Sequence, residues 1–314
     1  MPLDPVLKGF LDQMAMMPGP KMFELPPAQG REMFVAMMQM IGPKDVPVGK
    51  IENIKIPGPG GDIPLRVYTP VAAGADALPV LVYFHGGGFV IGDLETHDGL
   101  CRQFASEGGF RVIAVDYRLA PEHKFPAALD DAIAAVQWIE AHASELGVDA
   151  NRIAVGGDSA GGALAAEVAQ LAKVKGAPKI AFQLLMFPVT QIGKETSSRQ
   201  EFAIGYFLDK PTIDWFFAQY IPAGTDMTDT RVSPLNAADF KGLPPAYVML
   251  GGYDPLHDEG LAYAKKLQDA GVKVEIADYA DLVHCFIYMQ AVLPQAVGAV
   301  TAAAKAVRAG LGGK

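Results

Sequence analysis

The stretch "NRIAVGGDSAGGALAAEVAQ", Asn151 to Gln170, changes from an apolar, β-branched run to an alanine-rich run of helical period. Two glycines mark the change, and the pattern predicts a buried strand that leads directly into a helix. Residues 157–161, GDSAG, match G-x-S-x-G and place Ser159 on the turn between the two elements. Glycine tolerates the crowding of so sharp a turn, so the hydroxyl of Ser159 is expected to stand above the sheet. The N–H of Ala160, in the first helical turn, is a candidate donor to a developing oxyanion.

The rest of the chain repeats this alternation from about Ile51 to the C-terminus. Helical period is clearest at residues 126–147, in the segment after Ser159, at residues 258–271 and in the last twenty-odd residues. The predicted strands are a pair joined by a glycine-rich turn, "IENIKIPGPGGDIPLRVYTP", followed by "PVLVYF", "RVIAVD", "RIAVGG", "IAFQLLMF", "AYVML" and "KVEIADY". Runs this apolar are typical of strands buried on both faces. The chain is therefore predicted to form an α/β fold with a mostly parallel central sheet flanked by helices.

Two segments do not fit the alternation. Residues 1–49 contain nine of the 13 methionines, and residues 191–230 carry aromatic side chains without strand period. Both are interpreted as helical additions to the sheet. Methionine packs into irregular gaps, so core filling is the favoured interpretation of the methionines over contact with a ligand.

Composition and charge exclude several functions. With 314 residues and 50% hydrophobic residues, the chain can bury a large core. Its net charge of −9 and pI near 5.2 argue against nucleic acid as a partner. Two cysteines, distant in sequence, indicate neither a disulfide framework nor a zinc site. The sequence starts without a signal-peptide pattern and has no run of membrane-spanning length, so a cytoplasmic protein without stable membrane insertion is expected.

A glycine run forms a second candidate element of the site. The segment 81–93, "LVYFHGGGFVIGD", places His85 and three glycines directly after an apolar strand. Consecutive glycines let backbone amides approach a reacting carbonyl group, which makes the run a source of further oxyanion donors. The spacing does not match a Walker loop or the dinucleotide fingerprint, so neither phosphate-binding interpretation is supported.

A nucleophilic serine needs a base and an acid, which in this architecture follow in the order serine, acid, histidine. His284, after the last predicted strand, is favoured as the base over His257, which lies at the start of a predicted helix. Asp254 leaves the carboxyl end of an apolar strand and is favoured as the acid, because chemistry gathers at this edge of open α/β sheets. Asp281, three residues before the histidine, is the rival acid.

Taken together, six motifs resemble the bacterial hormone-sensitive-lipase-like family of carboxylesterases, which has the α/β-hydrolase fold. They are "HGGGFVIGD", "DYRLAPEHKFPAALDD", "GGDSAGGALA", "SPL" at 233–235, "YDPLHDEG" and "VHCF". The resemblance covers nearly the whole chain. It implies a catalytic triad of Ser159, Asp254 and His284.

The same resemblance implies further roles. The oxyanion donors would be the backbone amides of Gly87, Gly88 and Ala160. Residues 1–49 and 191–230 would form a helical cap over a catalytic core of residues 50–190 and 231–314. Candidate substrate contacts are Phe34, Met38 and Phe89. One departure is that Cys285 follows the histidine where similar family members usually carry glycine.

The expected function is hydrolysis of short to medium acyl esters through an acyl-enzyme, because the cap sequence has no interfacial amphipathic stretch. No metal or organic cofactor is expected, and the partner is a small-molecule ester. Alternatives on the same fold are amide, carbamate or lactone hydrolysis, and a receptor without catalysis. A dinucleotide-dependent oxidoreductase is disfavoured because its glycine fingerprint is absent. The resemblance also suggests a homodimer through an exposed sheet edge, with "KVEIADY" as the candidate strand.

Overall fold

A single sheet forms the centre of the computed structural model, which describes residues 1–74, 76–173 and 177–313. Its eight strands have the order β1-β2-β4-β3-β5-β6-β7-β8. The first two pairings, β1 with β2 and β2 with β4, are antiparallel, and all later ones are parallel. The strands are β1 (Lys50–Gly58), β2 (Gly61–Thr69), β3 (Leu78–Phe84), β4 (Arg111–Val115), β5 (Val148–Asp158), β6 (Ile180–Met186), β7 (Ala246–Tyr253) and β8 (Val274–Val283). All the strands predicted from the apolar runs are therefore confirmed.

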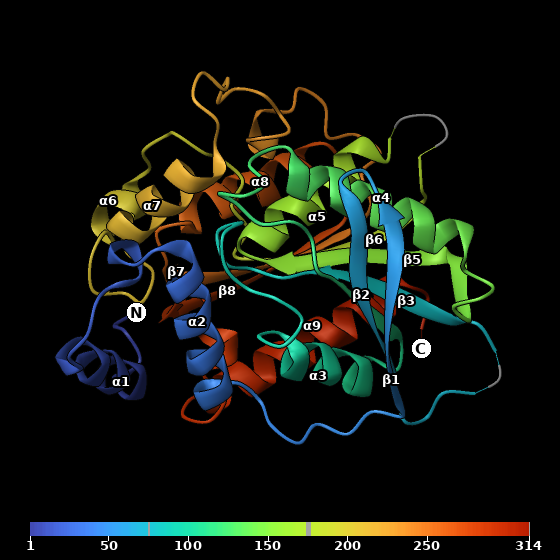
Figure 1. The fold of residues 1–314 in the computed structure, drawn as a ribbon, viewed down its shortest axis with the longest axis horizontal. Helices are drawn as coiled ribbons and strands as arrows, with labels where there is room; N and C mark the ends of the chain where they lie inside the picture. Colours follow the sequence, from blue (N-terminus) through green and yellow to red (C-terminus); the bar gives the residue numbers. More distant parts are fainter. Residues whose placement is uncertain (75, 174–176, 314) are drawn as a thin grey trace.

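Helices cover both faces of this sheet (Figure 1). One face carries α4 (Ala127–Ala141), α5 (Ala160–Leu171) and α8 (His257–Asp269), and the other carries α3 (Asp98–Gly108) and α9 (Pro294–Gly310). The remaining helices are α1 (Pro5–Met16), α2 (Pro27–Ile41), α6 (Ser197–Glu201) and α7 (Lys210–Tyr220), with short 3₁₀ turns η1 (Met22–Glu24), η2 (Pro234–Asn236) and η3 (Phe286–Tyr288).

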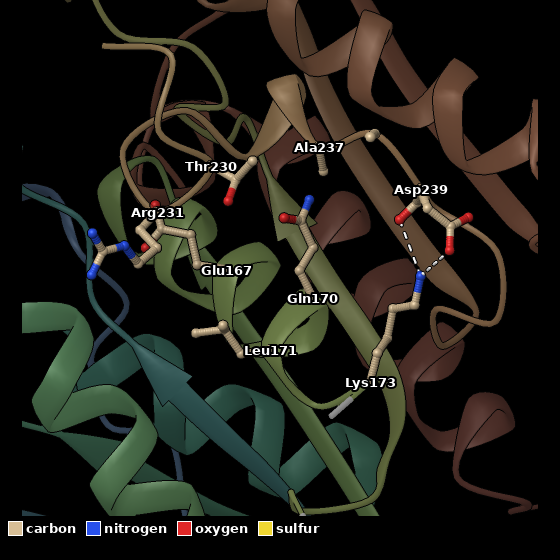
Figure 2. Close-up of a pocket in the computed structure, with 9 residues that line it drawn as sticks. Glu167, Gln170, Leu171, Lys173, Thr230, Arg231, Ala237 and Asp239 are labelled. Carbon is tan, nitrogen blue, oxygen red and sulfur yellow. Dashed lines mark hydrogen bonds and ion pairs between the residues drawn. The ribbon is translucent and has the colours of Figure 1, made fainter. Parts of the chain in front are cut away.

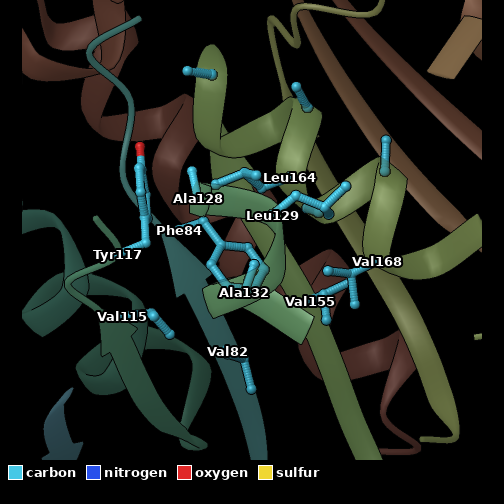
Figure 3. Close-up of a cluster of buried hydrophobic side chains, with 14 of the residues drawn as sticks. Val82, Phe84, Val115, Tyr117, Ala128, Leu129, Ala132, Val155, Leu164 and Val168 are labelled. Atoms are coloured by element: carbon cyan, nitrogen blue, oxygen red, sulfur yellow. The ribbon is translucent and has the colours of Figure 1, made fainter. Parts of the chain in front are cut away.

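The central strands are buried on both faces, as their unbroken apolar runs predict. On β3, Val82 and Phe84 pack toward α4 and α5, whereas Leu81 and Tyr83 pack toward α3 and α9. Figure 3 shows the first of these layers, in which Phe84 and Val155 meet side chains of α4 and α5. Side chains of successive residues alternate across a strand, so each strand contributes to both cores.

The two segments that broke the alternation are helical. Residues 1–49 contain α1 and α2, and residues 191–230 contain α6 and α7, and α2 lies beside α7 at one end of the sheet (Figure 1). A Cβ atom on Gly30 of α2 would lie 3.8 Å from the ring of Trp215 on α7, so these two helices pack closely. The division into core and cap stays a prediction.

The interpretation of the methionines as core filler is only partly correct. Met38 is buried with a 5% exposed side chain, but Met16, Met17 and Met40 are 84%, 62% and 59% exposed. Met16 and Met40 lie on α1 and α2, where only one helix face can be covered by the rest of the chain, and Met17 directly follows α1. Periodicity alone did not reveal which face that is.

Candidate active site

The candidate nucleophile stands on a strained turn between β5 and α5. Ser159 has a φ of 53°, in the left-handed region that L-residues rarely adopt. A Cβ atom on Gly157 would lie 2.3 Å from the carbonyl oxygen of Phe84, and one on Gly161 would lie 1.9 Å from it. Both glycines are therefore required by close packing of the turn against β3. The Ser159 N–H donates to the carbonyl of Met186 at 2.9 Å, which anchors the turn to β6.

Three side chains, distant in sequence, meet at the carboxyl end of the parallel strands. His284 follows β8, and its Nε2 lies 3.0 Å from the Oγ of Ser159. Its Nδ1 lies 2.6 Å from Oδ2 of Asp254, which follows β7. The second carboxylate oxygen of Asp254 accepts the N–H of Leu256 at 2.8 Å, so the acid is fixed by its own loop. Because Nδ1 faces a carboxylate, it carries the proton, and Nε2 is left to accept the hydrogen of the serine.

The surroundings tune the imidazole as a base. Ser159, Asp254 and His284 are 7%, 0% and 3% exposed. Burial lowers the pKa of His284, but the charge and hydrogen bond of Asp254, together with Cys285, outweigh burial, and the pKa lies well above its usual range. The ring of Phe187, at the end of β6, meets the imidazole edge to face with centroids 4.8 Å apart. This aromatic contact fixes the plane of the ring, and the sequence offered no signal for it.

Backbone amides converge on the same place from two elements. Gly87 and Gly88 have φ values of 117° and 59°, conformations that glycine adopts freely. Within the described part of the chain, the N–H groups of Gly87, Gly88 and Ala160 donate to no other group. Ala160 is the first residue of α5, where backbone donors have no partner in the helix. These free donors belong to the two segments that the sequence singled out.

A buried carboxylate joins the glycine run to the nucleophile turn. Asp158, adjacent to the serine, accepts the N–H of Gly86 at 3.0 Å and the hydroxyl of Tyr83 at 2.5 Å. Burial alone would raise the pKa of Asp158, but the nearby His97 and these donors outweigh burial and lower it. In the sequence, the only signal for this role of Asp158 is a charged residue at the end of an apolar strand.

The helical segments pack directly on the glycine run. Phe216 of α7 lies against Gly88, where an added Cβ atom would approach its ring to 2.2 Å. Phe89 is 1% exposed, and its ring stacks on Tyr220 of α7 at 3.9 Å between centroids. Arg31 of α2 donates to the carbonyl of Val90 at 2.8 Å. The loop is thus held by contacts from both helical segments.

Another set of contacts braces the loop that carries Asp254. Ser198 of α6 donates its hydroxyl to the carbonyl of Pro255 at 2.8 Å. The neighbouring Arg199 pairs with Glu259 of α8 at 2.7 Å, and both side chains are buried. Burial raises the pKa of Glu259 to about 7, against the opposing effect of the arginine. In the sequence, Glu259 only lies near the start of the helix predicted at residues 258–271, and the fold shows that it pairs with the 191–230 segment.

The rival residues make other contacts. His257 has its Nε2 3.2 Å from Oδ2 of Asp278. Asp281 is half-buried, and its carbonyl accepts the N–H of Asp4 at 3.0 Å. Cys285 adopts a φ of 60°, the conformation in which glycine is the usual residue, and burial raises the pKa of its thiol. A thiolate nucleophile is therefore not favoured at this position.

The candidate substrate contacts are near the site but differ in exposure. The half-buried Phe34 of α2 lies 6.3 Å from the ring of His97. Met38, one helical turn further along α2, is buried in the hydrophobic cluster that includes Leu7 and Ile41. Phe89 is enclosed by its stack on Tyr220. Their role toward a substrate stays a prediction.

Two further properties concern the described residues as a whole. Among them, no helix combines the length and the hydropathy that a membrane crossing requires. Nor do residues 1–74, 76–173 and 177–313 bring together three His, Cys, Asp or Glu side chains that could hold a metal ion.

The fold and this site define a hydrolase of the α/β-hydrolase class with a serine nucleophile. The chain belongs to the hormone-sensitive-lipase-like family of this class, as the resemblance of its motifs predicts, and a family described as "alpha/beta hydrolase fold" matches residues 81–288.

Relatives with established names resemble the chain over most of its length. It is similar to carboxylesterase NlhH of Mycobacterium tuberculosis, with 43% identity over 305 residues, 95% of this chain and 92% of NlhH. Carboxylic ester hydrolase LipN of the same organism is 46% identical over 243 residues, 76% of this chain, which spans only 64% of LipN. The solved structure of ester-hydrolase EH1AB1 from the metagenome of Lake Arreo, complexed with a bipyridine phosphonate derivative, has a TM-score of 0.95, 45% identity and 99% coverage of both chains.

Proposed function

We propose that the protein is a serine carboxylesterase that hydrolyses short to medium acyl esters through an acyl-enzyme. The observation that carries the proposal is the continuous chain of contacts from Asp254 through His284 to Ser159, at 2.6 and 3.0 Å. The names of NlhH and LipN, both ester hydrolases, support the same reaction. A receptor without catalysis would have no need of this arrangement.

In the first stage, the Nε2 of His284 takes the proton of Ser159 while the serine oxygen attacks the ester carbonyl carbon. The tetrahedral intermediate collapses, the imidazolium gives its proton to the leaving alcohol, and an acyl-serine remains. In the second stage, water attacks the acyl-serine with His284 again as the base, and the acid product leaves. Asp254 keeps the imidazole in the productive tautomer and stabilises its cation.

The oxyanion of both intermediates would be held by the N–H groups of Gly87, Gly88 and Ala160. These N–H groups donate to no other acceptor in the described chain, which supports this assignment. Loss of one such donor typically costs about 3 kcal/mol of transition-state stabilisation. The Asp158 contact with Gly86 then acts as a positioning contact, because it holds the glycine run against the nucleophile turn.

Residues 1–49 and 191–230 would act together as the cap over the acyl pocket. The packing of α7 on Gly88 and of α2 on the segment 85–92 supports this assignment. Phe34 and Met38 would then face the acyl chain together with Phe89. A rate series on p-nitrophenyl esters from acetate to palmitate tests the chain-length preference, and a maximum at palmitate would contradict it.

The decisive experiment compares Ser159→Ala with wild type on p-nitrophenyl acetate. We expect a loss of about 10³-fold or more in kcat, since the covalent intermediate can no longer form. Ser144→Ala, on an exposed serine, is the matched control and should hydrolyse at the wild-type rate. Equal rates in wild type and Ser159→Ala would end the proposal. Matched ester and amide substrates then decide which bond is preferred.

A homodimer through β8 is also proposed. β8 is the last strand of the sheet and pairs only with β7 in the described chain, so its outer edge can add a second copy. Light scattering of the purified protein gives its mass in solution, and a monomer at all concentrations would exclude the dimer. Cytoplasmic location is proposed as well, and cell fractionation tests it.

A further inference from the structure

A second hollow lies on α5, away from the triad. Figure 2 shows it between α5 and the segments on either side of η2. Its volume is about 320 Å³. Its lining residues include Glu167, Gln170 and Leu171 of the helix, and no triad residue is among them. Glu167 follows Ser159 by eight positions, which is about 12 Å along a helix. The volume is at the lower end of the range for small-molecule sites, so it suits a small ligand.

The wall of this hollow contains an orphaned carboxyl group. Glu167 is only 3% exposed, and its Oε2 has no hydrogen-bond partner in the described residues. Burial, followed by the charge of Asp229, raises the pKa of Glu167 well above its usual range. A buried polar atom without a partner costs free energy, about 1–3 kcal/mol, that a suitable ligand would recover.

Two other oxygen atoms share the wall with the carboxyl group. Gln170 lies one helical turn after Glu167, on the same face of α5. Its Nε2 donates to the carbonyl of Pro234 at 2.8 Å and to the hydroxyl of Tyr263 at 3.2 Å, which fixes the amide and leaves Oε1 as an acceptor. Across the hollow, Figure 2 shows the hydroxyl of Thr230 directed toward this face of the helix. Within the described chain neither Oε1 of Gln170 nor the hydroxyl of Thr230 is used in another hydrogen bond.

The charges around the hollow favour a cation. The two basic residues in its lining are already paired, Lys173 with Asp239 at 2.8 Å and Arg231 with Asp229 at 2.7 Å. Ionised Glu167 would therefore leave one uncompensated negative charge. Of the two carboxylates in the lining, Asp239 is already paired with Lys173, which leaves Glu167 alone, fewer carboxylate ligands than a divalent metal would require. Three acceptors of mixed type, one of them anionic, match the three donors of a primary ammonium group.

We propose that this hollow binds the primary ammonium group of a short aliphatic amine, with Glu167, Gln170 and Thr230 accepting its three hydrogens. Leu171 and Ala237, which also line the hollow, offer an apolar wall for the alkyl stem. The site is independent of ester hydrolysis, since it shares no residue with the triad or the glycine run.

The test is isothermal titration calorimetry of the wild-type protein with n-butylammonium chloride at constant ionic strength. We expect saturable 1:1 binding with release of a proton, because burial raises the pKa of Glu167 and a bound ammonium group would favour the ionised carboxylate. Titrations in buffers of different ionisation enthalpy measure that proton. Tetramethylammonium, which has no N–H donor, should not bind, and potassium should bind more weakly.

Variants identify the acceptors. Glu167→Gln keeps the shape of the side chain but removes a charge-assisted hydrogen bond, so it should weaken binding by about tenfold or more. It should also abolish the release of a proton. Thr230→Val, on an exposed residue whose replacement should not disturb folding, should weaken binding severalfold. Glu107→Gln is the matched control, because Glu107 also has a buried unpartnered oxygen but lies on α3, outside the hollow, and binding should be unchanged.

Three results would each overturn the proposal. One is the absence of saturable binding up to about 100 mM amine, an affinity too weak for a specific site. Another is equal affinity for tetramethylammonium or potassium, which would indicate an unspecific cation site. The third is unchanged binding in both Glu167→Gln and Thr230→Val.

Discussion

The contact between Gly88 and Phe216 connects the glycine run to α7, and a substitution at Gly88 measures its contribution to stability and activity. A Cβ atom on Gly88 would lie 2.2 Å from Cγ of the Phe216 ring and 2.5 Å from both Cδ atoms. Carbon atoms pack at about 3.5–4.0 Å, so Gly88→Ala forces the ring or the glycine run to move by about 1 Å or more. The alanine would also occupy a φ of 59°, which costs an L-residue about 1–2 kcal/mol.

We therefore expect Gly88→Ala to lower the free energy of unfolding by about 2–5 kcal/mol, the sum of about 1–2 kcal/mol of backbone strain and about 1–3 kcal/mol of overpacking. If the N–H of Gly88 binds the oxyanion, its displacement should also reduce kcat/KM about 10²-fold. Phe216→Ala alone removes a buried ring and should cost about 3–5 kcal/mol. In the double variant Gly88→Ala/Phe216→Ala the clash is absent, so the combined cost should fall short of the sum by about 1–3 kcal/mol.

The assay is urea unfolding together with p-nitrophenyl acetate hydrolysis for the two single variants, the double variant and a control. Gly298→Ala is the control, because a Cβ atom at this helical position of α9 meets nothing within 4 Å. It should keep full activity and gain up to about 1 kcal/mol of stability. Costs that add in the double variant to within about 0.5 kcal/mol would refute the clash, and wild-type kcat/KM in Gly88→Ala would refute the oxyanion role of this loop.

Three further predictions concern charge. Asp254→Asn should reduce kcat by about 10³–10⁴-fold. It should also shift to lower pH the range in which kcat/KM rises as His284 loses its proton, because the raised pKa of His284 depends on that carboxylate. A pH–rate profile in which this rise stays at the wild-type pH would contradict the prediction. Burial lowers the pKa of His85 to about 4, below its unfolded value, so its contribution to stability is complete above about pH 6.5 and is lost as the pH falls toward 4. The free energy of unfolding in urea is measured at about pH 7.5 and pH 4.5 for both proteins. The decrease between these two pH values should be about 2–3 kcal/mol smaller in His85→Asn than in wild type. Equal decreases would refute the lowered pKa of His85. Arg199→Met should cost about 3–5 kcal/mol by leaving the buried Glu259 without its partner, and a thermal midpoint equal to that of the wild type would show that the pair does not brace the fold.

Local patterns were sufficient for the strands, for the helices α4, α5, α8 and α9, and for the serine turn, but they did not indicate α3. The run from Asn151 to Gln170 carries its own information, because β-branched residues, glycines and alanines each favour one backbone conformation over a few residues. The order of Ser159, Asp254 and His284 along the chain also restricts the triad, since the carboxyl ends of parallel strands meet at one edge of a sheet. Exposure of the N-terminal methionines was not predictable in this way, because it depends on which helix face the rest of the chain covers.

The sequence by itself therefore determined the α/β architecture, the turn that raises Ser159 and the candidates for base and acid. Only the tertiary structure decided that Phe216 rests on Gly88, that Asp158 holds Gly86, and that Glu167 opens onto a hollow. The physical reason is the distance along the chain over which each interaction acts. Backbone preferences act between neighbours in sequence, whereas van der Waals contact and desolvation act between atoms brought together from distant segments, and these have no periodic signature in the chain.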